Sequence, residues 1–221
     1  MYYSTDNPDH GMQYDPFKAL VVPRPIGWIS TLSESGTPNL APFSFFNGLS
    51  DRPPMLAASI ANGKDTLQNI IATGECTVCV ATHALVDAMN MSSAAVDSSV
   101  SEFSIAKLDT VASNHVKPPR VAQSPAAFEC RLWQSVELPV DTNSGAGYTT
   151  IILKVLGIYI DDAYITEGRV DTAKMQPLSR LGYMDYAIIN KDNMLTLNRP
   201  AVADDGKTVT LDTSPWDGKY K

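Results

Sequence analysis

The sequence predicts a mainly β protein, an antiparallel barrel with short helical insertions. Clusters of β-branched and aromatic residues are cut by turn residues at short intervals. The helical segments between these clusters are short and the connections are hairpin-like, which is typical of barrels. The chain has 221 residues, of which 44% are hydrophobic and 19% charged, so it can bury a sizeable core.

The first two predicted strands form a hairpin. They cover Ile26–Leu32 and Asn39–Asn47 around a turn at residues 33–36, and Met55–Ala61 follows as a third strand. Pro42 lies inside the second strand. Because proline cannot donate a hydrogen bond to a ladder, we expect this strand at an edge of the sheet or at a bulge, with its backbone partly free for a ligand.

A short helix is predicted over Thr66–Thr73. Asp65 and Gln68 fit a capping box in which Asp65 is the N-cap residue, and Gly74 is suited to end the helix. The continuous apolar run Thr77–Ala81 then predicts the next strand.

The second half of the chain predicts one more helical stretch and two long strands. The helical stretch covers Ala84–Met91 and leads into a serine-rich loop. Phe128–Val136 alternates apolar and polar residues, with Glu129 and Arg131 on the polar side, which indicates a half-buried antiparallel strand. Tyr148–Ile160 is rich in β-branched residues and apolar on both faces, so we expect it to be a central strand.

We expect a single domain over residues 1–200. Neither a linker nor a shift of composition interrupts residues 18–200. Residues 201–221 are polar and are expected to form a C-terminal tail or arm.

The charge balance disfavours a nucleic-acid partner. Seventeen basic and 24 acidic residues give a net charge of −7, whereas nucleic-acid binding needs a basic face. The chain lacks an apolar run long enough for a membrane span and lacks the features of a signal peptide. These observations predict a cytoplasmic protein without a membrane partner.

Cysteine and histidine patterns indicate neither a redox pair nor a metal site. Cys76 and Cys79 have C-x-x-C spacing, but residues three apart in a strand point to opposite faces, so we expect two packed thiols. The three histidines are never at ligand spacing, and a G-x-S-x-G motif is missing. The sequence therefore predicts no bound metal and no hydrolase triad.

Residues 24–75 combine side chains suited to a mononucleotide. Lys64 and Thr66 stand at the start of the predicted helix, where free amides, a hydroxyl and an ammonium group suit a phosphate. The aromatic residues offer flat surface for a planar ring: Trp28, Phe43, Phe45 and Phe46. The side-chain amides of Asn39 and Asn47 can bond the polar edge of such a ring. The alternative interpretation places the aromatic residues in the core and the lysine in solvent.

The same segment carries a family resemblance. It reads P-R-P-I-G-W-I-S-T, then N-L-A-P-F-S-F-F-N, then K-D-T-L-Q-N-I, and further blocks lie at residues 118–132, 160–171 and 177–186. On these blocks the chain resembles the flavin reductase-like family, and the resemblance extends over about residues 16–200. This family comprises FMN-binding split barrels and includes the flavoredoxins.

The resemblance implies a six-stranded split barrel that forms a homodimer and binds FMN near the subunit interface. Arg180 and Tyr186 match a family signature near the cofactor or the interface, and Asp65 would act mainly as the helix cap. The residues implied to contact FMN are the backbone of Ser44–Asn47 and Thr31 at the ring and ribityl chain, and Ser59, Lys64 and Thr66 at the phosphate.

The chain departs from the family pattern in two places. Cys79 stands where relatives have asparagine, and Gly145–Gly147 stands where one branch has a Gly-Asp-His turn associated with nicotinamide binding. Direct oxidation of a nicotinamide is therefore a separate question from FMN binding.

Three functional hypotheses follow from the resemblance. The first is an FMN-dependent oxidoreductase that takes hydride from NADH or NADPH and passes it through FMN to free flavin or another acceptor. The second is a flavoredoxin-like electron-transfer protein that exchanges electrons with a protein partner and has no nicotinamide site of its own. The third is a non-catalytic, flavin-binding dimeric barrel. No residue is assigned as a general acid or base, because the flavin supplies the redox chemistry.

Overall fold

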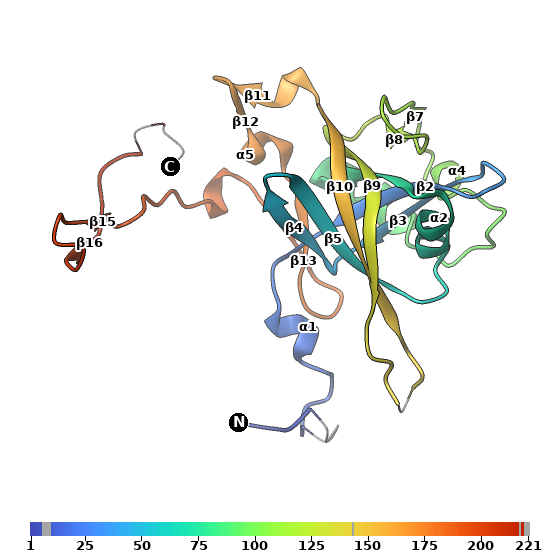
Figure 1. The fold of residues 1–221 in the computed structure, drawn as a ribbon, viewed down its shortest axis with the longest axis horizontal. Helices are drawn as coiled ribbons and strands as arrows, with labels where there is room; N and C mark the ends of the chain where they lie inside the picture. Colours follow the sequence, from blue (N-terminus) through green and yellow to red (C-terminus); the bar gives the residue numbers. More distant parts are fainter. Residues whose placement is uncertain (6–9, 143, 217, 219–221) are drawn as a thin grey trace.

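The computed structural model describes residues 1–5, 10–142, 144–216 and 218. Within this part of the chain, the main sheet contains seven antiparallel strands in the order β3-β2-β6-β9-β10-β5-β4 (Figure 1). The mainly β class and the central position of β10 are confirmed. The strands are β2 (Gly27–Leu32), β3 (Pro38–Phe43), β4 (Phe46–Asp51), β5 (Pro54–Ala61), β6 (Glu75–Val80), β9 (Ala126–Glu137) and β10 (Tyr148–Ile160).

The two edge strands of this sheet are consecutive in the sequence. β3 pairs with β2, β4 pairs with β5, and the chain passes from one edge to the other through Ser44 and Phe45. The prediction of one continuous strand over Asn39–Asn47 is therefore wrong, and the described sheet has seven strands where six were expected. In a twisted sheet the two edges lie in different places, so one straight strand cannot pair at both. The chain therefore leaves the ladder with β2 before it enters the ladder with β5.

The β3 edge offers few backbone donors to a ligand or to another strand. The backbone nitrogens of Pro38, Leu40 and Pro42 point away from β2. Pro38 and Pro42 lack an N–H group, and the Leu40 N–H donates to a carboxylate oxygen of Glu102 at 3.0 Å. Glu102 is the first residue of α4 (Glu102–Ile105) and is buried. The edge position predicted from Pro42 is confirmed. The backbone expected to be partly free for a ligand offers no unpaired donor among Pro38, Leu40 and Pro42.

Two apolar clusters lie on opposite faces of the sheet. Ile29 and Cys76 belong to the cluster that packs against α2 (Asp65–Thr73), whereas Trp28 and Cys79 belong to the cluster that packs against α3 (Val86–Met91) and α4. Successive residues of a strand face opposite sides of the sheet. Trp28 and Ile29 of β2 therefore lie in different clusters, and so do Cys76 and Cys79 of β6. The prediction that the two cysteines point to opposite faces is confirmed.

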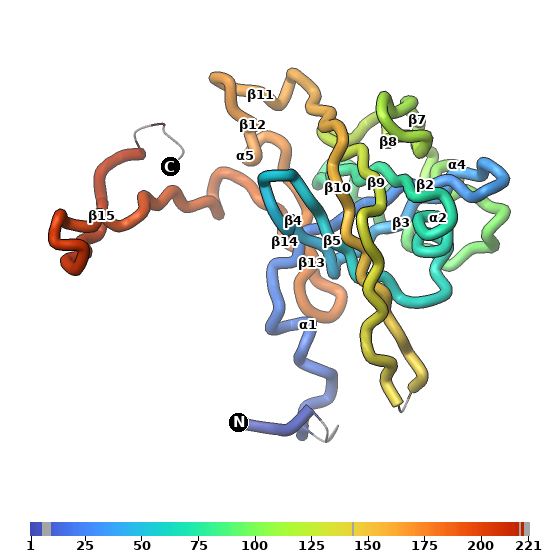
Figure 2. The backbone as a smooth tube through the Cα atoms, viewed as in Figure 1, coloured from blue at the N-terminus to red at the C-terminus, as the bar shows by residue number. Residues whose placement is uncertain are grey.

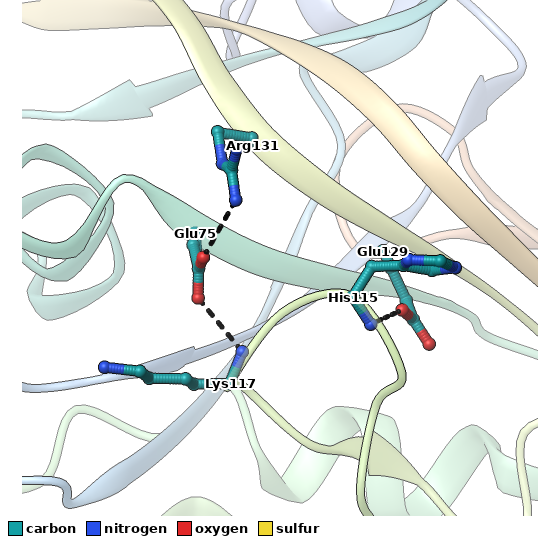
Figure 3. A network of polar contacts seen from close by, with 5 residues as sticks. All are labelled: Glu75, His115, Lys117, Glu129 and Arg131. Carbon is teal, nitrogen blue, oxygen red and sulfur yellow. Dashed lines mark hydrogen bonds and ion pairs between the residues drawn. The ribbon is translucent and has the colours of Figure 1, made fainter.

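A loop covers part of the outer face of β6 and β9. Glu129, expected on the solvent-facing side of its strand, is only 4% exposed, because its carboxylate accepts hydrogen bonds from the backbone of Asn114 at 2.9 Å and His115 at 2.6 Å. Nearby, Glu75 accepts from the backbone of Lys117 and contacts Arg131 at 3.5 Å (Figure 3). These contacts fix the loop over residues 113–118 against the sheet.

The remaining elements lie at the ends and sides of the barrel. β9 and β10 continue as a hairpin beyond the rest of the sheet (Figure 2). A second sheet, in the order β1-β13-β14, lies beside the N-terminal helix α1. The bounds are α1 (Phe17–Leu20), β1 (Arg24–Pro25), η1 (His83–Leu85), β7 (Thr110–Val111), β8 (Arg120–Val121), η2 (Asp162–Tyr164), β11 (Ile165–Thr166), β12 (Arg169–Val170), α5 (Thr172–Met175), β13 (Leu178–Arg180), β14 (Tyr186–Ile188), η3 (Lys191–Asn193), β15 (Ala201–Val202) and β16 (Val209–Thr210).

The C-terminal segment extends away from the barrel and carries the small β15–β16 hairpin (Figure 1). The extended segment begins before the predicted boundary at residue 201, and we use the word arm for residues 191–216. Its side chains Leu195, Leu197 and Leu211 are 89%, 85% and 83% exposed. Residues 217 and 219–221 of the expected tail lie outside the described residues. Among the described residues, the helices are all too short or too polar to cross a membrane.

We expect replacement of Glu102 by alanine to lower the free energy of unfolding by about 1–3 kcal/mol, because it leaves the buried Leu40 N–H without an acceptor. Glu102→Gln keeps an acceptor oxygen and should cost less. Glu34→Ala, an exposed substitution in the β2–β3 turn, serves as the control. Urea denaturation measures the differences, and equal stability of Glu102→Ala and wild type would contradict this role.

We also expect the chain to form a homodimer in which the arm covers apolar surface of the second copy, because large exposed apolar side chains mark interfaces. Sedimentation should give a dimer for the full chain and a monomer for a variant that ends at Asn190. A full-length chain that stays monomeric at micromolar concentration would refute the prediction.

Candidate functional site

A cleft of about 720 Å³ opens where the chain crosses between the two edges of the sheet. This volume lies within the range of about 300–1,000 Å³ typical of small-molecule sites. The β3–β4 connection contributes Ser44 and Phe45, and β5 contributes Ser59. Other walls come from the N-terminal segment around α1 and from the turn between β13 and β14.

A smaller hollow of about 410 Å³ adjoins the cleft. The two share Pro42, Phe43, Lys64 and Ser93 in their linings, so Lys64 stands at their junction. The hollow is lined by the first residues of α2, by residues 94–96, by Ser98 and by Glu102. A ligand that spans both volumes would therefore pass Lys64.

The first turn of α2 faces this hollow with its amides uncapped. The N-cap residue is Lys64 in an extended conformation, without a side-chain cap, so the predicted capping box at Asp65 is wrong. Within the described part of the chain, the amides of Asp65 and Thr66 have no hydrogen-bond partner. The helix ends at Gly74, as predicted, and Gly74 adopts the left-handed conformation at φ 75°. Free N–H groups at a helix start, beside a lysine, form a favourable position for an anion.

Buried polar side chains support the start of α2. The Asn39 amide donates to the Thr66 hydroxyl at 2.9 Å and to the Thr31 hydroxyl at 3.2 Å. Asn69 of α2 donates to the same Thr31 oxygen at 3.0 Å. These bonds tie β2, β3 and α2 together, and they hold the helix N-terminus against the sheet.

The opposite part of the cleft is aromatic. The rings of Phe45 and Tyr148 meet edge to face, with centroids 5.9 Å apart. The Ser59 hydroxyl lies 2.7 Å from that of Thr150 on the neighbouring strand. The cleft thus presents ring surface at one side and hydroxyl, amide and ammonium groups toward α2.

The structure brings most of the sequence-predicted residues together. The cleft is lined by Ser44, Phe45, Ser59, Lys64 and Arg180, and the hollow by Asn39, Lys64 and Thr66. Thr31 is buried directly beneath the hollow, where Asn39 contacts it.

Three predicted residues lie elsewhere. Trp28 is fully buried in the core and donates its indole N–H to Ser92 at 2.9 Å. Phe46 packs against Gly27, where an added Cβ would come within 2.7 Å of its ring. Asn47 is exposed on β4, and its side chain accepts the N–H of Gly48. The alternative interpretation, aromatic residues in the core, therefore holds for Trp28 and Phe46.

Sequence reasoning missed Arg24, which is 6% exposed and lines the cleft. β1 pairs with β13 so that Arg24 stands directly opposite Arg180. Burial, and then the charge of Arg180, lower the pKa of Arg24. A pairing between strands more than 150 positions apart leaves no local signal in the sequence.

The buried thiols are poorly suited to redox chemistry. Burial raises the pKa of Cys79 to about 12, and a hydrogen bond with Cys130, together with burial, raises the pKa of Cys76. Because the thiolate is the reactive form, both remain unreactive thiols near neutral pH. Among the described residues, no three histidine, cysteine or acidic side chains gather as metal ligands.

Comparison with known proteins decides the family. The family model for the flavin reductase like domain matches residues 19–178. The chain belongs to this family. An uncharacterized protein of Aquifex aeolicus (strain VF5) is a relative of this flavin reductase-like chain, 35% identical over 192 residues that cover 84% of this chain and 94% of the other.

Solved structures place the flavin reductase-like chain among split barrels. Nitrilotriacetate monooxygenase component B from Bacillus cereus superposes with a TM-score of 0.77 at 27% identity, covering 88% of this chain and 100% of that one. The 2-nitrobenzoate 2-nitroreductase NbaA of Pseudomonas fluorescens superposes with a TM-score of 0.77 at 25% identity, covering 90% and 96%. The predicted family and the split-barrel fold are confirmed, and the family indicates a flavin-related redox function.

Proposed function

We propose that the protein is an FMN-dependent oxidoreductase that takes hydride from NADH or NADPH and delivers it to free flavin or another acceptor. The observation that carries the proposal is the uncapped start of α2, which opens at Lys64 between a polar hollow and an aromatic cleft. A mononucleotide with a planar ring has the same division into an anionic end and a flat apolar end.

The residues present fit FMN. The amides of Asp65 and Thr66, the Lys64 ammonium group and the Ser59 hydroxyl would hold the phosphate. Ser44 and Phe45, which lie outside both neighbouring strands, would contact the flavin ring with their backbone and the Phe45 side chain. Asn39 and Thr31 would keep α2 in position from beneath.

When bound, the flavin supplies the hydride acceptor and the route by which electrons leave. The protein's own part is to bind and orient the ring, to leave one side open to the donor and to limit the access of water. The lining residues need not donate or remove a proton for this task, so we assign no general acid or base.

A second candidate is an electron-transfer flavoprotein reduced by a protein partner. Gly145–Gly147, where one family branch has its nicotinamide-associated Gly-Asp-His turn, lacks both the acid and the histidine. This departure favours a donor other than a nicotinamide.

Anaerobic mixing separates the two candidates. The FMN-loaded protein is mixed with excess NADH or NADPH while absorbance near the flavin band is followed. We expect bleaching with at least one nicotinamide, because the first candidate takes hydride from it directly. Protein that keeps its colour with both nicotinamides, yet bleaches with dithionite, would refute the first candidate and support the second.

Replacing Lys64 by alanine should weaken FMN binding by about ten- to a hundredfold, since a shielded charge-assisted contact contributes about 1.5–3 kcal/mol. Riboflavin, which lacks the phosphate, should bind equally well to both proteins. Thr66→Val removes the hydroxyl that accepts the Asn39 amide at 2.9 Å and holds the start of α2 in position, so it should act in the same direction. Fluorescence quenching of the two flavins measures these affinities.

Lys154→Ala, at an exposed position of β10, is the matched control and should bind both flavins as the wild type does. A folding defect would weaken FMN and riboflavin alike. Wild-type FMN affinity in both Lys64→Ala and Thr66→Val would show that the phosphate lies elsewhere, whatever the family.

A further inference from the structure

Two arginines stand side by side in the cleft. Arg24 and Arg180 are register partners of β1 and β13, and both line the cleft. The Arg24 guanidinium donates to the backbone carbonyls of Lys18, Val21 and Leu181, and its Nε lies 3.5 Å from the Ser44 hydroxyl. All of these acceptors are neutral, so hydrogen bonding holds Arg24 in place without neutralising its charge.

Arg180 is held in the same way. Its guanidinium donates to the Tyr186 hydroxyl and to the backbone carbonyl of Tyr183, and it lies over the Tyr186 ring with Cζ 4.5 Å from the centroid. Within the described residues, neither Arg24 nor Arg180 forms an ion pair with a carboxylate. Two adjacent positive charges therefore lack a counter-charge from the protein.

The cleft as a whole is basic although the chain is acidic. Its charged lining residues are Lys18, Arg24, Lys64 and Arg180 against Asp15 alone, while the chain has 17 basic and 24 acidic residues. The Asp15 carboxylate accepts the N–H of Phe17 at 2.8 Å, at the start of α1. The cleft is therefore positively charged although the whole chain has a net negative charge, and this favours binding of an anion in the cleft.

Burial, and then the neighbouring charge of Arg180, disfavour the charged form of Arg24 and lower its pKa. An anion placed between the two guanidinium groups would offset this effect through charge-assisted hydrogen bonds. Four of the five Arg24 N–H groups are already bonded, so Arg24 offers a carboxylate its charge and one N–H. Among the described residues, the Nε–H of Arg180 has no partner, and a planar guanidinium matches the two oxygens of a carboxylate better than a lysine does. Clefts where such unfavourable charges are retained are typical of functional sites.

The surroundings of the arginines indicate what carries the carboxylate. Tyr14 and Tyr183, which also line the cleft, have ring centroids 5.7 Å apart. The Phe45 ring centroid lies 5.9 Å from that of Tyr148 and 6.0 Å from the Arg24 guanidinium carbon. The positive charge thus borders aromatic surface, which suits a flat apolar ring with one acidic substituent.

We propose that Arg24 and Arg180 form a second anion site, distinct from the start of α2, that binds the carboxylate of a small aromatic acid. In the proposed function this acid is the acceptor that binds next to the flavin ring. That part of the proposal rests on FMN binding. The carboxylate site itself does not depend on FMN, because neutral protein groups position both arginines.

Isothermal titration with benzoate, and with benzyl alcohol as its neutral counterpart, tests the site on FMN-loaded and FMN-free protein. Wild type should bind benzoate more tightly than benzyl alcohol, and only benzoate binding should weaken with added sodium chloride. Arg180→Gln should weaken benzoate binding by about ten- to a hundredfold. Arg180→Lys, which keeps the charge but loses the fork, should lose less.

Arg52→Gln is the control, since it removes one positive charge at an exposed position that pairs with Asp51. It should leave benzoate binding unchanged. Circular dichroism verifies that each variant is folded, and the salt dependence of the wild type tests the charge requirement without any substitution.

Equal benzoate affinity in wild type and folded Arg180→Gln would overturn the proposal. So would an Arg180→Gln variant that loses FMN but not riboflavin, because the arginines would then hold the flavin phosphate. If Arg180→Gln loses NADPH binding but still binds benzoate as the wild type does, the proposal is also overturned, because the arginines would then bind a nicotinamide dinucleotide phosphate. If the protein binds benzoate but does not bind added FMN, the proposed function is refuted and the carboxylate site is supported.

Discussion

The crossing at Ser44 and Phe45 is the constraint on which the rest of the structure depends. There the chain leaves the ladder of β3 with β2 and enters the ladder of β4 with β5. The Phe45 carbonyl accepts the Ser59 N–H of β5 at 2.8 Å, whereas within the described residues the backbone N–H groups of Ser44 and Phe45 have no strand partner. The cleft forms at this gap, and α2, α1 and the β13–β14 turn surround it.

Positive charge in the cleft comes from two independent sources. At the start of α2, uncapped amides and Lys64 concentrate it at the boundary with the hollow. At the other side, the pairing of β1 with β13 brings Arg24 against Arg180. The two positions suit two different anionic groups, one on a cofactor and one on a second ligand. In this arrangement, one cleft can orient two molecules by their charged ends while their flat parts share the aromatic surface.

Buried acids organise the cover of the sheet without taking part in the cleft chemistry proposed for the arginines. Glu102 accepts the outward N–H of Leu40 and thereby closes the β3 edge with α4. Glu129 accepts two backbone N–H groups of the loop that packs over β6 and β9. Each carboxylate replaces the ladder partner or the water that a backbone donor would otherwise need. They thus keep loops in place where sheet edges and faces would remain open.

Local patterns in the sequence determined the strands β2, β5 and β10, the end of α2 at Gly74 and the opposite facing of Cys76 and Cys79, because backbone propensity and side-chain alternation act between near neighbours. The tertiary structure alone decided which residues reach the cleft. It placed Trp28 and Phe46 in packed positions, divided one apolar run between two sheet edges, buried Glu129 beneath a loop and set Arg24 opposite Arg180. These outcomes depend on contacts between segments far apart in the chain, where packing and charge, not local periodicity, settle the arrangement.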